Sequence, residues 1–167
     1  TKYYRFSMTG RRQRFDKLPE PYKSYPDSES ISLPEPIKSG GANIWDVLMN
    51  RRSRRNYTIE SLSLPELSQL IWATQGVTAY AGRYALRTSP SAGALYPIET
   101  YIIVNRIDNL EAGVYHYNVL NHALELIKKG NFGRDISKAA LDQTMLEDSA
   151  FVFIWTAIVA RSKWKYG

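Results

Sequence analysis

The sequence contains no cysteine and only two histidines, His116 and His122. The absence of cysteine excludes a disulfide scaffold, a cysteine-ligated zinc or iron–sulfur site and a thiol nucleophile. Two histidines are too few for a histidine-rich metal site, and no apolar run approaches the ~20 residues of a membrane-spanning helix. The first residues are polar and basic, without the apolar stretch of a signal peptide. We therefore expect a cytoplasmic protein with no membrane anchor and no resident metal.

The composition favours a folded chain with an irregular N-terminal segment. Of the 167 residues, 44% are hydrophobic and 13% aromatic, which excludes a wholly disordered protein. The length fits one domain or a large part of one. Residues 1–41 hold five of the eight prolines and predict an irregular arm, whose aromatic side chains pack onto the body or onto a partner subunit. Residues 42–167 are expected to form the folded part.

Positive charge is concentrated at the front of the chain. Residues 1–55 carry twelve Lys and Arg against six Asp and Glu, whereas residues 56–167 carry ten of each. The excess gathers in Arg11–Arg14 and Arg51–Arg55. Such clusters attract phosphate groups, which leaves three readings open: a nucleic acid, a small phosphorylated ligand, or a solvated basic surface. No nucleic-acid-binding motif is present.

Hydrophobic periodicity predicts a mixture of helices and strands. Ser63 and Glu66 have the spacing of a capping box, which predicts the start of a helix, and Gly76 is a natural stop for the same helix. Other helices are expected over 43–52 and 133–142, and strands over 98–104, 113–118, 122–127 and 151–159. The last strand consists mainly of β-branched and aromatic residues, so we expect both of its faces to be buried. Residues 161–167 are expected to begin a further element.

Three groups of residues have side chains suited to chemistry. The arginines and serine of Arg51–Arg55 offer planar forks and a hydroxyl for phosphate. The small residues of Pro90–Gly93 let a flat ligand approach the backbone, and Ser91 could cap the helical turn that follows. Lys165 and Tyr166 could act as a base and a proton donor. Taken singly, each group is more often a structural feature: a helix end for the arginines, an ordinary loop for Pro90–Gly93 and an exposed pair for Lys165 and Tyr166.

Taken together and in order, four segments resemble the nitroreductase family of flavoproteins. These segments are Arg51–Arg55, Arg87–Glu99, Gly113–Tyr117 and Arg161–Gly167. More narrowly, they are similar to the SagB-type dehydrogenase branch, which includes azoline oxidases of thiazole and oxazole peptide biosynthesis. The resemblance covers roughly residues 28–167. It implies an α+β fold with a mixed, largely antiparallel sheet flanked by helices, in an intertwined homodimer.

The resemblance also implies FMN as the cofactor and assigns residues to it. The segment that holds FMN in the family corresponds to Arg51, Arg52, Ser53 and Arg55, with Arg55 as the phosphate contact. The segment that reaches the same flavin from the other subunit corresponds to Pro90, Ser91, Ala92 and Gly93. Many family members carry Asn where this chain has Ala94, so that polar contact to the ring is expected to be absent or replaced. The proton-handling pair of the azoline oxidases corresponds to Lys165 and Tyr166.

The expected function is FMN-dependent oxidoreduction of a small-molecule or peptide substrate, with oxidation of an azoline to an azole as the specific case. The alternatives are a flavin-binding or scaffold subunit without chemistry and, further away, a nucleic-acid binder. Family members continue well past the Lys-Tyr-Gly sequence at 165–167. We therefore expect a C-terminally truncated chain, the N-terminal portion of the domain, which alone exposes apolar surface near strand 151–159.

Overall fold

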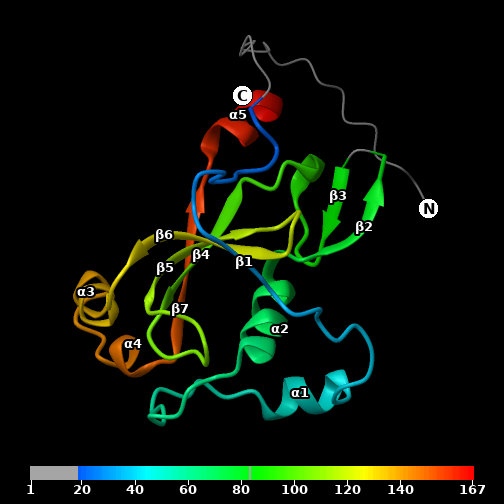
Figure 1. The fold of residues 1–167 in the computed structure, drawn as a ribbon. Helices are drawn as coiled ribbons and strands as arrows, with labels where there is room; N and C mark the ends of the chain where they lie inside the picture. The colour runs from blue at the N-terminus through cyan, green and yellow to red at the C-terminus, as the bar shows by residue number, and fades with distance from the viewer. Residues whose placement is uncertain (1–18, 83) are drawn as a thin grey trace.

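A five-stranded sheet forms the centre of the computed structural model, which describes residues 19–82 and 84–167 (Figure 1). Its strands follow the order β1-β6-β5-β4-β7, and every neighbouring pair is antiparallel. They comprise β1 (Ser30–Ser32), β4 (Ile98–Val104), β5 (Gly113–Asn118), β6 (Ala123–Lys129) and β7 (Phe151–Ala157). A separate hairpin consists of β2 (Val77–Ala81) and β3 (Tyr84–Arg87).

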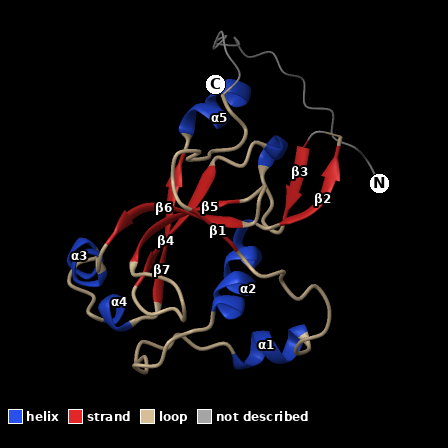
Figure 2. Ribbon diagram, in the orientation of Figure 1, coloured by secondary structure: helices blue, strands red, loops and turns tan. Residues whose placement is uncertain are grey.

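The helices lie around this sheet, as Figure 2 shows. They are α1 (Ile44–Asn50), α2 (Leu64–Gln75), α3 (Gly133–Ala139), α4 (Met145–Asp148) and α5 (Val159–Tyr166), with a short 3-10 turn η1 (Ala92–Ala94). In this view α1 and α5 occupy opposite ends of the molecule. No helix in the described part of the chain is both long and apolar enough to traverse a bilayer.

The hydrophobic core lies between α2 and one face of the sheet. Leu67 and Ile71 of α2 are fully buried, as are Ile102 of β4 and Leu124 of β6. The register places Ile102 opposite the buried Tyr115 of β5, so these side chains share one face. Burying such a side chain contributes roughly 1.5–3 kcal/mol, and this packing fixes α2 against the sheet.

Several sequence predictions are confirmed. The predicted strands 98–104 and 113–118 are β4 and β5, and α2 begins at the predicted capping box and ends at Gly76. The backbone N–H of Ser63 donates to Glu66 Oε2 (2.9 Å), and the Ser63 hydroxyl accepts from the backbone N–H of Glu66 (3.4 Å). These hydrogen bonds pair amide groups that the first turn of a helix leaves free.

The expectation that strand 151–159 is buried on both faces is wrong. β7 is the edge strand of the sheet and pairs with β4 alone among the described strands. Residues Phe151 to Ile154 are half-buried, whereas Trp155, Thr156 and Ala157 are exposed. An edge strand lacks a neighbour on one side, so an apolar sequence by itself did not reveal how much of it is covered.

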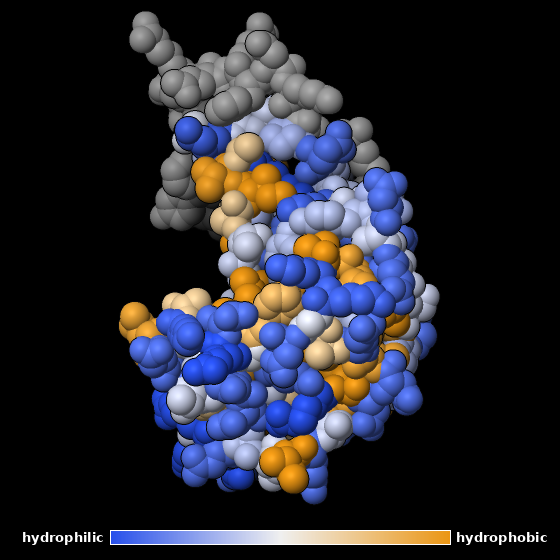
Figure 3. Space-filling view, turned by 60° about the vertical axis from the view of Figure 1, so that its left-hand side comes forward, coloured by the Kyte–Doolittle hydropathy of each residue, from blue (hydrophilic) through white to orange (hydrophobic). Residues whose placement is uncertain are grey.

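The predicted helix over 43–52 forms as α1, but its apolar side chains are exposed. Asn43 caps it by accepting from the backbone N–H of Trp45 (2.8 Å). Exposed apolar residues of α1 are Ile44, Trp45, Val47, Leu48 and Met49. In Figure 3 apolar side chains gather in separate patches toward both ends of the visible face. The segment 19–41 supplies β1, and the Arg11–Arg14 cluster lies outside the described residues.

We expect Ser63→Ala to lower the free energy of unfolding by about 1 kcal/mol, the usual cost of removing an N-cap side chain. The loss arises because the hydroxyl no longer accepts from the first turn of α2. Urea unfolding would measure it. Ser61→Ala is the control, because Ser61 is exposed and lies just outside the cap. An equal loss in both variants would contradict a role for the capping box.

Candidate functional site

The Pro90–Gly93 segment belongs to a strained loop between β3 and β4. Gly93 (φ 65°), Ala94 (φ 54°) and Tyr96 (φ 40°) all lie in the left-handed region. That region costs roughly 1–2 kcal/mol for a residue other than glycine. The Ser91 hydroxyl does not cap η1 as predicted; it accepts from the backbone N–H of Tyr96 instead (2.9 Å). This hydrogen bond closes the loop on itself, as strained backbone requires.

Lys165 and Tyr166 of α5 lie against this loop. A Cβ atom built on Gly93 would stand 2.5 Å from Lys165 Nζ and 2.9 Å from the Tyr166 hydroxyl. A larger residue would therefore require both side chains to move, and glycine also suits the positive φ. The structure brings together two groups that the sequence suggested separately, from opposite ends of residues 90–166.

The Arg51–Arg55 segment follows α1 and is exposed. Ser53, Arg54, Arg55 and Asn56 line a shallow, open hollow. The guanidinium of Arg52 is used locally, because Nη1 donates to the backbone oxygens of Met49 (2.9 Å) and Arg51 (2.8 Å). Arg52 thus closes the end of α1, while the hollow is formed by the residues after it.

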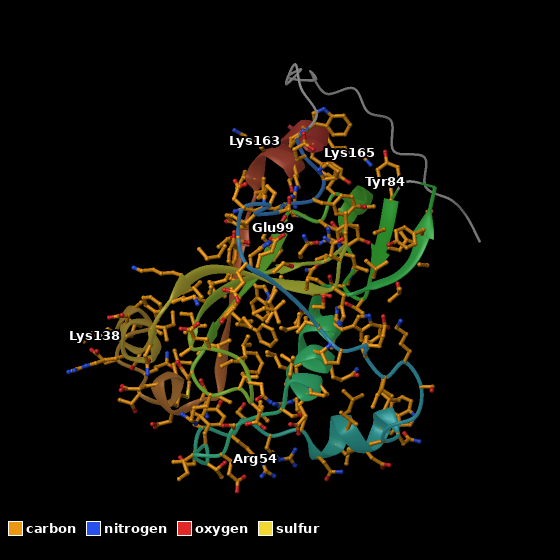
Figure 4. All side chains as sticks on the ribbon, in the orientation of Figure 1. Arg54, Tyr84, Glu99, Lys138, Lys163 and Lys165 are labelled. Carbon is orange, nitrogen blue, oxygen red and sulfur yellow. The ribbon has the colours of Figure 1, made fainter. Side chains whose placement is uncertain are left out.

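Within one chain, the hollow and the loop are far apart. Figure 4 places Arg54 at one end of the molecule and Lys165 at the other. The predicted site residues therefore form two groups: Arg51, Arg52, Ser53 and Arg55 in one, and Pro90, Ser91, Ala92, Gly93, Lys165 and Tyr166 in the other. The hollow is lined by Ser53 to Asn56 and by none of the residues of the second group.

Each group has features that suit a flat, phosphate-bearing ligand. The guanidinium groups of Arg54 and Arg55 have no hydrogen-bond or ion-pair partner among the described residues, so they are available to an anion. Beside the loop, the Ser89 hydroxyl is buried without a partner in the described part of the chain. Buried polar atoms are normally hydrogen-bonded, so this hydroxyl is also available.

A row of buried charged side chains runs from the sheet toward α5. His116 is fully buried, with Nδ1 2.8 Å from Glu125 Oε2 and Nε2 3.2 Å from Glu99 Oε2. The other oxygen of Glu99 forms an ion pair with Arg161 of α5. The side chains therefore follow one another in the order Glu125, His116, Glu99 and Arg161. No cluster of metal-ligating residues occurs within 19–82 and 84–167.

The pKa of Glu99 reflects these partners. Burial raises it, because a charged carboxylate loses its hydration, but the hydrogen bond from His116 and the guanidinium of Arg161 outweigh that effect. The pKa of Glu99 therefore lies below its ordinary value. The sequence treatment of His116 as a packed or surface residue agrees with its burial, but the row itself was not predicted.

Arg87 of β3 supports the loop from the other side. Its backbone N–H donates to the Tyr96 hydroxyl (3.1 Å), and its guanidinium lies 4.3 Å from the centroid of the Tyr96 ring. Nη1 also donates to Gln75 Oε1 at the end of α2 (3.2 Å). Burial lowers the pKa of Arg87, and the nearby Glu99 carboxylate opposes that shift. Tyr96 is thus held at its ring, its hydroxyl and its backbone.

Some residues of these groups were missed by the sequence analysis. Arg54 and Asn56 line the hollow but fall outside the motif positions. Glu99, His116 and Arg161 form the buried row, and the available signal was a lone acid in the apolar strand 98–104. A charged residue in such a strand is stable only when it has a partner. The sequence did not show which residue that partner was.

We expect Gly93→Ala to displace Lys165 and Tyr166 from the loop. Gly82→Ala is the matched control, because Gly82 also has a positive φ (59°) but a Cβ there meets nothing within 4 Å. Both variants should lose roughly 1 kcal/mol of stability from backbone strain. If Lys165 serves catalysis, only Gly93→Ala should also lower turnover, by about 100-fold. Equal turnover in the two variants would contradict the contact.

The chain is similar to several known proteins. The sequence pattern of the Nitroreductase family matches residues 48–167. A protein of Methanocaldococcus jannaschii assigned as a nitroreductase, MJ1384, is 38% identical over 143 residues, which cover 84% of this chain and 68% of that protein. The trifolitoxin operon protein TfxC of Rhizobium leguminosarum bv. trifolii is 31% identical over 160 residues. That match covers 81% of this chain and 44% of TfxC, so the chain spans less than half of that relative.

Solved structures carry the same fold. A crystal structure from Anabaena variabilis, assigned as a nitroreductase, superposes with a TM-score of 0.66 at 26% identity and covers 90% of this chain and 28% of its own. A chain of the E. coli microcin synthetase McbBCD complex, with truncated pro-MccB17 bound, superposes with a TM-score of 0.54 at 28% identity. That match covers 79% of this chain and 53% of the microcin synthetase chain. These matches confirm the α+β, nitroreductase-like fold. The chain belongs to the nitroreductase family, whose members are generally flavin-dependent oxidoreductases.

Proposed function

We propose that this chain is part of an FMN-dependent oxidoreductase that oxidises a thiazoline or oxazoline in a peptide to the aromatic azole. The observation that carries the proposal is the contact of Lys165 and Tyr166 with Gly93. It places a potential base and a potential proton donor beside the small-residue loop proposed to face the flavin. A scaffold subunit would have no need for that arrangement.

The proposed reaction removes a proton and a hydride from the substrate ring. FMN, when bound, supplies the two-electron acceptor for the hydride. The amine of Lys165 takes the proton from one ring carbon, and the hydride leaves from the neighbouring ring carbon. The electron pair of the C–H bond that loses the proton becomes the new double bond between these two carbons. Tyr166 orients the amine and passes the proton to solvent. The ring loses two hydrogens and becomes aromatic.

The proposed cofactor contacts need two copies of the chain. The hollow at Ser53–Asn56 and the loop at Pro90–Gly93 lie at opposite ends of one molecule (Figure 4). One FMN held by both must therefore take the hollow from one subunit and the loop from its partner. The exposed apolar side chains of α1, such as Trp45 and Leu48, supply surface that a second chain would cover. We infer a homodimer with two equivalent sites.

Similarity supports a peptide substrate. TfxB of the same Rhizobium is named as a trifolitoxin-processing protein and is 37% identical over 98 residues, covering 56% of this chain and 26% of TfxB. The microcin synthetase complex was solved with a truncated precursor peptide bound. A processing protein and a synthetase with bound pro-MccB17 both favour a peptide as the substrate proposed for this chain, and azoline oxidation is a reaction that a flavoenzyme can perform on a peptide.

The experiment that tests the function starts from the purified protein. Its visible absorption spectrum after incubation with FMN reports binding, and intact mass confirms the chain. A synthetic peptide that contains one thiazoline is then added under air, and mass spectrometry follows the loss of two hydrogens. Oxidation supports the proposal. Bound flavin with an unchanged peptide contradicts azoline chemistry and favours a scaffold role, and failure to bind FMN contradicts the cofactor.

We expect two inactive variants to restore one site when they share a dimer. Arg55→Ala removes a proposed phosphate contact, and Gly93→Ala distorts the loop that the partner presents. In a mixed dimer, one site receives both defects and the other receives neither. Unfolding and refolding the two variants together should therefore recover turnover well above that of either variant alone. No recovery, with mixed dimers verified by mass, would contradict a site shared between subunits.

A further inference from the structure

Arg161 is the buried side chain of helix α5, and among the described residues it supplies the polar contacts of this helix with other segments. The exposed fraction of Arg161 is 2%. Lys163, Trp164, Lys165 and Tyr166 are exposed. Since apolar packing of α5 is sparse, its placement depends on the polar contacts of Arg161. These contacts therefore decide where Lys165 and Tyr166 lie.

Arg161 binds the backbone of two other segments. Its Nη1 donates to the backbone oxygen of Tyr96 (2.7 Å), and its Nε donates to the backbone oxygen of Glu20 in the arm (2.9 Å). Tyr96 is the last left-handed residue of the loop that contains Gly93. The same guanidinium thus holds α5 and the strained loop against each other.

The ion pair with Glu99 orients the guanidinium. Glu99 is fixed in turn by His116, and His116 by Glu125, so the row is anchored on β4, β5 and β6. Asn118 donates to the other oxygen of Glu125 (2.7 Å) and ends the row. Buried charges need such partners to persist. The rigid sheet therefore sets the direction in which Arg161 points.

We propose that Arg161 is a positioning residue: it holds α5 on the 91–96 loop so that Lys165 and Tyr166 lie on Gly93. This inference rests on the proposed function for its catalytic meaning, but its structural part does not. A residue that only stabilised the fold would affect the whole sheet when removed. Removal of a positioning residue affects α5 and the loop more strongly than the sheet.

The test compares Arg161→Gln and Arg161→Lys with the control Lys163→Gln, all in the complete protein. Hydrogen–deuterium exchange is followed for peptides of α5, of the 91–96 loop and of strands β4 to β6. In Arg161→Gln the buried Glu99 carboxylate loses its ion-pair partner, so some rise in exchange is expected in the strands as well. We expect the rise in α5 and the loop to exceed the rise in the strands by about tenfold or more. Arg161→Lys keeps the charge beside Glu99 and should recover part of the protection. Lys163→Gln should behave as the unmodified protein.

Flavin content and turnover of the thiazoline peptide complete the test. In Arg161→Gln we expect kcat per bound flavin to fall at least about tenfold, with a smaller change in KM. Unchanged exchange in α5, or an equal rise in α5 and in β4 to β6, would overturn the inference. If Arg161→Gln fails to fold, the intermediate protection expected of Arg161→Lys decides. Absence of turnover in the unmodified protein would refute the proposed function alone, since the exchange pattern still tests Arg161.

Discussion

Glu99→Ala is expected to destabilise the fold by about 3–5 kcal/mol, the range for removing one partner of a buried ion pair. The loss is large because Arg161 is almost fully buried and would be left without its carboxylate. His116 would lose the partner of Nε2 at the same time. Removing the methylene groups of Glu99 adds a smaller packing cost. Urea or thermal unfolding of the two proteins would measure the difference.

Glu111→Ala is the matched control for Glu99. Glu111 forms an ion pair with Lys129 at 2.8 Å, but both side chains are more than half exposed. Surface pairs contribute about 0–1 kcal/mol because water and salt screen them, so this variant should unfold almost as the unmodified protein does. A cost for Glu99→Ala as small as that for Glu111→Ala would mean that the buried row adds nothing to the fold.

The stabilisation by Glu99 should also depend on pH. Its pKa is lower in the folded protein than its ordinary value of 4.5, so the unfolded chain binds the proton more readily. The contribution is therefore fully present above the ordinary carboxyl pKa and is lost as the pH falls through the folded value. Stability measured from neutral to acidic pH should converge for Glu99→Ala and the unmodified protein. A difference in unfolding free energy that stays constant across that pH range would show that the ion pair is not the source of the stabilisation.

Local signals in the sequence predicted local structure well. The capping box of Ser63 and Glu66 is read within four residues, and it fixed the start of α2 correctly. The strands β4 and β5 could be predicted because each is a short run rich in β-branched and aromatic residues. The hairpin β2–β3 was missed, because Gly82 and the tyrosines around it gave no clear alternation.

Long-range placement could not be predicted in the same way. The sequence treated the 151–159 strand as central, but burial depends on which neighbours a strand obtains, and β7 lies at the edge. Equally, nothing in the order of residues shows that Arg161 meets Glu99 or that Lys165 meets Gly93. The candidate site is formed by these contacts between residues far apart in the sequence. The resemblance to the nitroreductase family suggested which residues belong to the site, whereas the fold showed which of them are in contact.

Lys165→Ala is expected to lower oxidation of the thiazoline peptide by about 100- to 10,000-fold, the usual contribution of a general base. Lys165 is proposed to take the proton, so its loss should act on the chemical step and leave bound FMN unchanged. Its side chain is exposed and packs on a loop rather than in the core, so stability should change by about 0.5 kcal/mol or less. Anaerobic reduction of the bound flavin by the peptide would measure the chemical step directly.

Lys163→Ala controls for the loss of one positive charge on the same helix. Lys163 is exposed, and its side chain has no hydrogen-bond or ion-pair partner among the described residues. A general effect of charge on peptide binding would appear in both variants and mainly in KM, whereas loss of the base appears in Lys165→Ala alone and in kcat. Added primary amines should restore part of the rate in Lys165→Ala, because a small amine can enter the space and accept the proton. Full activity of Lys165→Ala with bound FMN would show that Lys165 is not the catalytic base and that its contact with Gly93 is only structural.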